Sequence, residues 1–453
     1  MTRRAGRKVD PMEREIERAL EPGSFIPDRA SFSFVSDLEM TTAAIAKLIP
    51  SDPRRAVRLC EAFLAGCQEK AEEVDDSSGS FGQFVQGLFC EWIQARQGSG
   101  ADPDETATRL LSFMDRDTYG FSNGLEKEAA KALDKAGLAA LELKVRARFE
   151  TAATGKSPMD GSLRSDPDYL RRHWSGVLRS VYLAQRDFAA YVALSERTGL
   201  TAQDCQAIAT MLVARRKPQD ALDWVERGLG IEKQTPQYGF AGYELAKLRR
   251  VLLSKLGRGG EALDLAWAEF RKRPSRFAYD DLMKFAPKSE QTVWHENAMG
   301  ALEGTDIGSA IELLLGTKEL ERLANLVRRT TDGELQRESH YVTEPAAKKL
   351  EKRHPDLAAR LWRAQGMRIV DAKKSKYYDA ALSNFERAMF LFGKAGLAAE
   401  WAKTVSDVRT RHRLKTGFMP DFEKLVAGSP PSEKPSFLER AKKRWGGLEK
   451  EIS

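Results

Sequence analysis

Apolar residues recur at every third or fourth position along most of this 453-residue chain. The clearest stripe follows the spacing i, i+3, i+4, i+7 and i+8, and consists of Cys205, Ile208, Ala209, Leu212 and Val213. This spacing places the side chains on one face of an α-helix, and such a face packs against a neighbouring element. The strict alternation of apolar and polar residues that is typical of β-strands is not sustained. The pattern therefore predicts an all-α protein.

Two consecutive helical hairpins are predicted between residues 204 and 274. Pro218 separates the helices of the first hairpin, because proline cannot continue a helix but suits the first turn of the next one. The second helices of the two hairpins are related, since Ala221-Leu222-Asp223 matches Ala262-Leu263-Asp264, and a similar segment recurs at 381–387. Internal similarity of this kind is typical of an α-solenoid, in which each hairpin needs its neighbours to bury its apolar face.

The hairpins resemble tetratricopeptide repeats, although the step from Ala221 to Ala262 is longer than the roughly 34 residues of that repeat. An irregular helical domain without a true repeat is the alternative. We expect an all-α fold in which an N-terminal helical domain precedes an α-solenoid-like, tetratricopeptide-like array of helical hairpins.

Four regions are predicted from the distribution of turn-forming residues. We expect a basic flexible arm over 1–30, a helical domain over 31–152, the hairpin array over 166–427, and a linker with a short basic helix over 428–453. Gly, Ser and Pro without apolar periodicity mark the boundary at 154–162. Besides the two hairpins, we expect helices over 11–20, 37–48, 53–73, 81–95, 104–114, 125–136, 138–152, 188–197, 377–392 and 397–413. The periodicity is weaker between 280 and 329, where it is compatible with helices over 290–302 and 306–315.

Composition and charge narrow the function classes. Hydrophobic residues make up 42% of the chain and charged residues 31%, as in a charge-rich globular protein. The formal net charge of +7 permits an anionic partner without requiring one. The chain has no run of about 18 apolar residues, and acidic residues follow the basic N-terminus where a signal peptide needs an apolar core. We therefore expect a cytoplasmic protein with no membrane partner. Paired short spacing is missing among the cysteines, which predicts buried free thiols at Cys60, Cys67, Cys90 and Cys205.

Residues near the C-terminus resemble a known class of protein. The segments Tyr377–Ala381 and Gly396–Trp401 are similar to the helical C-terminal region of bacterial proteins with a SWIM-type zinc finger, as is the basic set Arg409, His412, Arg413 and Lys415. They are also similar to a related uncharacterised family that lacks the finger. The finger needs a C-x-C…C-x-H cluster, and this chain has no C-x-C. The resemblance therefore implies helical repeats in a bacterial protein without the zinc module, and it implies no activity.

One loop partly matches a calcium-binding EF-hand. The ligand positions 1, 3, 9 and 12 of such a loop are occupied by Asp115, Asp117, Asn123 and Glu126. Tyr119 is a poor ligand at position 5, and no second loop is visible. The alternative is a helix–helix connection with solvated carboxylates, and we expect no metal and no cofactor. Residues 154–157 resemble the end of a P-loop, but they follow a predicted helix where a P-loop follows a strand.

Basic residues gather at predicted helix C-termini, where a cation gains roughly 0.3–1 kcal/mol from the helix dipole. That position explains them without any ligand. The alternative is a basic strip that binds nucleic acid or an acidic protein. The residues concerned include Arg215, Arg216, Arg271 and Arg273.

Stacked hairpins present an extended surface, and binding of another macromolecule is the usual role of such a fold. We therefore predict a non-catalytic protein-interaction or scaffold protein whose partner is another protein. A nucleic-acid-associated protein that uses the basic helix ends and tails is the alternative. An enzyme is the third hypothesis, since no Ser/His/Asp or Cys/His arrangement has local support. The aromatic residues that we expect to contact a partner are Trp224, Tyr238, Tyr243 and Trp267.

Overall fold

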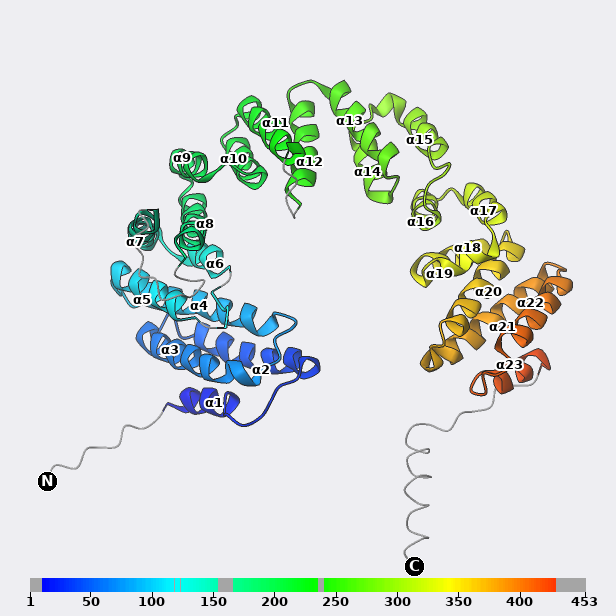
Figure 1. Ribbon diagram of the computed structural model, residues 1–453, viewed down its shortest axis with the longest axis horizontal. Helices are drawn as coiled ribbons and strands as arrows, with labels where there is room; N and C mark the ends of the chain where they lie inside the picture. The colour runs from blue at the N-terminus through cyan, green and yellow to red at the C-terminus, as the bar shows by residue number, and fades with distance from the viewer. Residues whose placement is uncertain (1–9, 118, 123, 154–165, 235–239, 429–453) are drawn as a thin grey trace, which may run out of the picture. The chain divides into compact units, whose positions relative to one another are not determined.

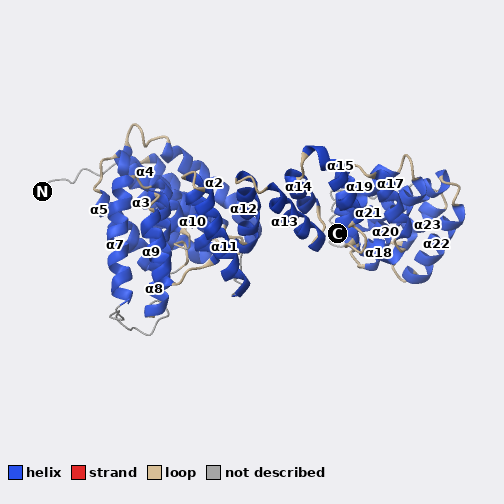
Figure 2. Cartoon of the chain, turned by 90° about the horizontal axis from the view of Figure 1, so that it is seen from above, coloured by secondary structure: helices blue, strands red, loops and turns tan. Residues whose placement is uncertain are grey.

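The computed structural model describes residues 10–117, 119–122, 124–153, 166–234 and 240–428. Within these ranges the chain forms helices joined by loops and turns, and it contains no strand (Figure 2). Strand-like backbone pairing is confined there to an isolated bridge between Ile26 and Val74. The all-α prediction is therefore confirmed. The chain divides into two compact units, Met1–Leu252 and Leu253–Ser453.

The first unit contains twelve helices in the part that the structure describes (Figure 1). Prolines at the first helical turn and acidic N-caps start several of them, as the sequence signals predict. The helices are α1 (Pro11–Ala19), α2 (Asp28–Ala46), α3 (Pro53–Lys70), α4 (Ser80–Gly98), α5 (Pro103–Arg116), α6 (Leu125–Ala132), α7 (Lys135–Ala153), α8 (Pro167–Gln185), α9 (Phe188–Thr198), α10 (Ala202–Ala214), α11 (Pro218–Gln234) and α12 (Ala241–Lys255), the last of which continues to the unit boundary and beyond.

Most helices of the first unit pack in two layers. Helices α2, α4, α6 and α8 contact one another in that order and form the even layer. In the other layer α1 packs on α3 and α5 packs on α7, while hairpin contacts such as α3–α4 and α7–α8 join the layers. Each amphipathic helix thus buries its apolar stripe against several neighbours. This packing confirms the α-solenoid-like array within the first unit.

The second unit is organised around α20, which packs against α18, α19 and α21. Trp362 of α20 is buried, and its indole N–H donates to Glu351 at 2.9 Å. Gly366 lets α21 approach, because a Cβ there would lie 2.9 Å from Cζ of Phe385. The helices are α13 (Gly259–Lys272), α14 (Arg276–Phe285), α15 (Gln291–Gly300), α16 (Ile307–Thr317), α17 (Leu320–Arg329), α18 (Asp332–Arg337), α19 (His340–Leu350), α20 (Pro355–Asp371), α21 (Tyr378–Lys394), α22 (Ala398–His412) and α23 (Met419–Val426).

Several helices differ from the sequence prediction. Helix α2 begins at Asp28 instead of residue 37, and α14, α17, α18 and α19 fall where no helix was expected. Pro345 lies inside α19, although proline disfavours the interior of a helix. Buried residues on both sides of this proline, among them Val342 and Ala346, hold the helix by packing. Tertiary burial therefore overrides the local preference of proline to end a helix.

Basic residues end four helices in a left-handed backbone conformation. Among the described residues, the non-glycine positions with positive φ are Arg186, Arg216, Lys318 and Lys373, with φ between 55° and 64°. They follow α8, α10, α16 and α20 respectively. Glycine is the usual residue at such a position, because a Cβ is disfavoured there. Each basic side chain instead stands at the negative end of a helix dipole.

Some predictions fall on residues outside the described ranges. These residues are 1–9 of the predicted basic arm, the predicted boundary at 154–162, and all but the first residue of the predicted tail at 428–453. The four cysteines are free, with Cys60, Cys67 and Cys205 buried. Burial raises the pKa of the Cys60 thiol to about 12. None of the helices in the described ranges is sufficiently long and apolar to cross a membrane.

Two glycines of α11 provide a matched test of helix packing. A Cβ at Gly228 would lie 2.7 Å from Cβ of Cys205 and 2.8 Å from Cδ1 of Leu245, whereas a Cβ at Gly230 would meet nothing within 4 Å. We expect Gly228→Ala to destabilise the protein by about 1–3 kcal/mol, because α10 and α12 must shift. Gly230→Ala should stabilise it by up to about 1 kcal/mol through helix propensity. Urea unfolding measures both changes, and similar stabilities for the two variants would contradict the close packing.

His412 is a buried titratable group at the end of α22. Its Nε2 lies 3.0 Å from Oδ1 of Asp371, and Oδ2 of the same carboxylate accepts a hydrogen bond from Arg411 at 3.0 Å. Burial lowers the pKa of His412, and Lys415 and Arg411 act in the same direction, while Asp371 opposes them. The neutral imidazole is therefore the form that the fold accommodates.

This burial predicts a pH dependence of the stability. With a folded-state pKa below the unfolded value of about 6.5, the unfolded chain binds more protons as the pH falls through that region. We expect the free energy of unfolding to decrease from pH 7.5 to pH 5.5, and to decrease less in His412→Gln. Urea titrations at both pH values give the two slopes, so a uniform destabilisation by the substitution does not affect the comparison. Equal slopes would show that His412 titrates normally.

Candidate functional site

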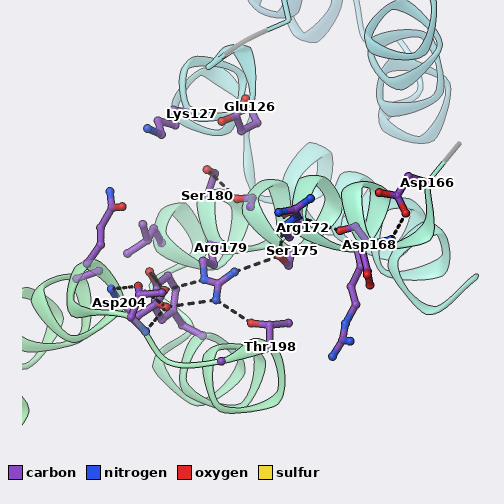
Figure 3. Close-up of a pocket in the computed structure, with 18 residues that line it drawn as sticks. Glu126, Lys127, Asp166, Asp168, Arg172, Ser175, Arg179, Ser180, Thr198 and Asp204 are labelled. Carbon is purple, nitrogen blue, oxygen red and sulfur yellow. Dashed lines mark hydrogen bonds and ion pairs between the residues drawn. The ribbon is translucent and has the colours of Figure 1, made fainter. Parts of the chain in front are cut away.

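A hollow of about 880 Å³ opens between α6, α8, α9 and α10 in the first unit (Figure 3). Side-chain caps fix the first turn of three of these helices, namely Asp166 for α8, Asp187 for α9 and Thr201 for α10. Helix α6 lies across from α8 in Figure 3 and contributes Glu126 and Lys127. We name this hollow the polar pocket. The residues that line it include Lys127, Arg171, Arg172, Arg179, Thr198 and Asp204.

An ion pair between Arg179 and Asp204 forms the centre of the polar pocket. Nε of Arg179 donates to Oδ1 of Asp204 at 2.7 Å, and one terminal nitrogen donates to Oδ2 at 3.3 Å. The guanidinium also donates to Oγ1 of Thr198 at 2.7 Å and to Oγ of Ser175 at 3.2 Å. These partners lie on α8, α9 and α10, so one side chain holds three helices together.

The carboxylate of Asp204 is buried and fully hydrogen-bonded. The hydroxyl of Tyr191 donates to Oδ1 at 3.1 Å, and Thr201 donates its N–H at 3.1 Å and its hydroxyl at 2.8 Å to Oδ2. Burial, together with the neighbouring carboxylate, raises the pKa of Tyr191, which keeps the phenol protonated as a donor. A buried charge is tolerated when it is paired and hydrogen-bonded. The network therefore gives the pocket a rigid floor.

Three further cations border the polar pocket without an acidic partner. Lys127, Arg171 and Arg172 take part in no ion pair within the described ranges. Arg171 donates to the carbonyl of Arg197 at 3.3 Å, and Arg172 donates to the carbonyl of Asp168 at 3.2 Å. These contacts position the two guanidinium groups but leave both of them outside any ion pair in the described ranges.

The lining also carries acidic groups. Glu126, Asp166 and Asp168 border the same hollow, so charges of both signs are exposed to it. Asp166 accepts a hydrogen bond from the backbone N–H of Asp168 at 3.1 Å. The hydroxyl of Ser175 donates to the carbonyl of Arg172 at 2.9 Å rather than to a base. This arrangement suits the binding of charged groups more than the activation of a nucleophile.

The aromatic residues expected to contact a partner lie in different environments. Trp224 is half-buried beneath the guanidinium of Arg227, at 4.9 Å from the ring centre. Tyr243 is 50% exposed. Trp267 packs on the core of the second unit, where it stacks on Phe270. Tyr238 lies outside the described residues.

The basic residues singled out from the sequence belong to helix ends. Arg215 donates to the carbonyl of Arg186 at 2.7 Å, and its guanidinium lies 5.2 Å from the ring centre of Phe188. Arg216 occupies one of the left-handed positions described above. Arg271 and Arg273 are exposed at the end of α13 in the second unit. Of these four, Arg215 is already engaged with the protein itself.

The residues of the EF-hand-like loop bind protein groups. Asp115 forms a two-pronged ion pair with Arg148, with both distances at 2.8 Å. Asp117 is buried and accepts backbone hydrogen bonds from Tyr119, Gly120 and Ser122. Asn123 lies outside the described residues, and Glu126 borders the polar pocket. Within the described ranges, no group of three or more His, Cys, Asp or Glu side chains could hold a metal ion.

Two polar networks were not predicted from the sequence. Thr201 and Asp204 form a capping box, a pattern readable in the sequence as Thr-x-x-Asp, but Arg179 gives no local signal. In the second unit, the hydroxyl of Tyr279 lies 2.8 Å from Nδ1 of His295, whose Nε2 lies 3.1 Å from Glu319. Tyr279 is buried against Phe270, so this chain of contacts joins helices within a core.

Replacement of Asp204 tests the role of the buried ion pair. We expect Asp204→Asn to lower the free energy of unfolding by about 3 kcal/mol, because Arg179 loses its charged partner in a largely buried site. Asp220 provides a matched control, because it is the third residue of α11 as Asp204 is the third residue of α10. It is exposed, and its Oδ2 lies 3.6 Å from Nζ of Lys217. Asp220→Asn should cost less than about 1 kcal/mol. Chemical unfolding measures both changes, and equal losses would refute the structural role of Asp204.

Comparison with known proteins places most of the chain in one family. No curated protein matches the chain. Residues 14–420 match a family of unknown function (DUF6880), and this range covers most of both units and every residue of the polar pocket. The chain therefore belongs to this family of unknown function.

Proposed function

We propose that this protein is a non-catalytic scaffold that binds another protein through the polar pocket. The observation that carries the proposal is the set of cations Lys127, Arg171 and Arg172, which form no ion pair in the described ranges, around a rigid ion-paired floor. Rigid side chains lose little conformational freedom when a partner binds, and charged groups of both signs complement a polypeptide segment. The partner segment would carry at least one carboxylate that pairs with these cations.

A protein partner suits the polar pocket better than a nucleic acid. Acidic residues such as Glu126 and Asp168 border the same hollow and would repel a phosphate backbone. Basic residues elsewhere have acidic partners, as in the pairs Arg249–Glu226 at 2.6 Å and Arg409–Glu423 at 2.6 Å. These pairs reduce the positive charge that remains available for phosphates. The proposal includes a cytoplasmic location and a helical array similar to tetratricopeptide repeats and to the helical part of the bacterial SWIM-finger proteins.

Charge reversal in the polar pocket tests the proposed function. The wild-type chain, the double variant Lys127→Glu/Arg172→Glu and the control Lys47→Glu/Lys247→Glu serve as baits in a nuclease-treated lysate of the source organism. The control residues are exposed on the same unit and have the same charge change. We expect a protein that the wild type and the control retain and the pocket variant loses, with an affinity for the purified partner that falls by roughly tenfold or more.

Two outcomes would overturn the proposal. A partner that binds the pocket variant as tightly as the wild type would place the binding surface elsewhere. Material that is captured only from a lysate without nuclease treatment would instead favour the nucleic-acid hypothesis, and its affinity should then fall steeply with salt. Thermal unfolding of both double variants shows whether they remain folded.

A further inference from the structure

A second hollow, of about 450 Å³, lies between α2 and α4 of the first unit. Its α2 wall is a single helical stripe, and its α4 wall runs alongside, with Oγ of Ser31 3.0 Å from Oγ of Ser80 at one end. We name this hollow the acidic groove. The residues that line it include Phe32, Val35, Glu39, Phe84, Gly87 and Glu91.

The acidic groove has an apolar floor and an open centre. Val35 and Phe84 are buried beneath it, whereas Phe32 at its edge is 81% exposed. A Cβ added at Gly87 would meet nothing within 4 Å, so this position of α4 leaves space above the floor. An exposed phenylalanine beside an apolar hollow is a feature of surfaces that bind another chain.

All the charged side chains that line this groove are acidic. Glu39 and Glu91 line it, and no Lys or Arg is among its lining residues. Neither carboxylate has an ion pair within the described ranges. Glu91 is partly buried, and its burial raises the pKa of the carboxyl group. A cation on a partner could pair with these carboxylates, which have no cationic partner within the described ranges.

We propose that the acidic groove binds a basic amphipathic helix of a partner protein. Apolar side chains of that helix enter between α2 and α4, while its Lys or Arg residues pair with Glu39 and Glu91. Helix-in-groove recognition uses this combination of an apolar floor and charged edges. The acidic edges disfavour nucleic acid and anionic lipid, which leaves a cationic polypeptide as the matching occupant. The acidic groove shares no residue with the polar pocket, and its charged side chains are all acidic. The inference therefore does not depend on the function proposed above.

A designed peptide serves as the probe. It has 18 residues, with Leu at helical i, i+3, i+4 and i+7 spacing and Lys at the other positions, and a counterpart carries Glu in place of Lys. Fluorescence anisotropy with the full chain measures both affinities. We expect saturable binding of the Lys peptide that weakens roughly tenfold or more in Glu39→Gln/Glu91→Gln. Gly87→Leu should block binding, because the new side chain fills the open centre of the groove.

The control variant Glu15→Gln/Glu69→Gln removes two exposed carboxylates from the same unit and should bind the Lys peptide like the wild type. Circular dichroism confirms that each variant keeps its helix content. Absence of Lys-peptide binding would refute the inference. Equal affinity for the wild type and the groove variants would also refute it, as would equally tight binding of the Glu peptide.

Discussion

Most helices in the described ranges bury an apolar stripe that only neighbouring helices can cover. In the first unit this constraint produces the even layer and its companion, which meet through hairpin contacts such as α3–α4 and α7–α8. Helices α10, α11 and α12 come close at Gly228, where there is no room for a Cβ between Cys205 and Leu245. Stability is then the sum of many neighbour interfaces, and a defect at one interface weakens the elements on both sides.

The same constraint determines where the charged side chains lie, because the helix faces that remain outside the core are polar. At the polar pocket a buried pair, Arg179 and Asp204, joins three helices and leaves other cations facing the hollow. At the acidic groove two carboxylates stand over an apolar floor without a counter-charge. One unit therefore contains two hollows of different charge, the first lined by groups of both signs and the second lined by carboxylates alone.

Local periodicity was sufficient to predict helices whose stripes are strong and whose ends carry Pro, Gly or an acidic cap, such as α10, α11 and α21. It was insufficient for α19, where burial outweighs Pro345. It also could not reveal the Arg179–Asp204 pair, because the partners lie on separate helices and meet only after packing. Aromatic residues were equally ambiguous, since Trp267 packs on a core although its sequence context also suits an exposed surface.

The basic residues in left-handed positions bear on the meaning of the net charge. A non-glycine residue costs roughly 1–2 kcal/mol in that conformation, yet Arg186, Arg216, Lys318 and Lys373 all adopt it at helix ends. Their charges are partly neutralised by the carbonyl groups of the preceding helices. A helix dipole carries no net charge, so this neutralisation acts near the helix ends and leaves the formal value of +7 unchanged for a distant polyanion. Long-range steering of anionic molecules in solution therefore follows the net charge, whereas an anion in close contact with these helix ends meets cations whose charge the neighbouring carbonyl groups already offset.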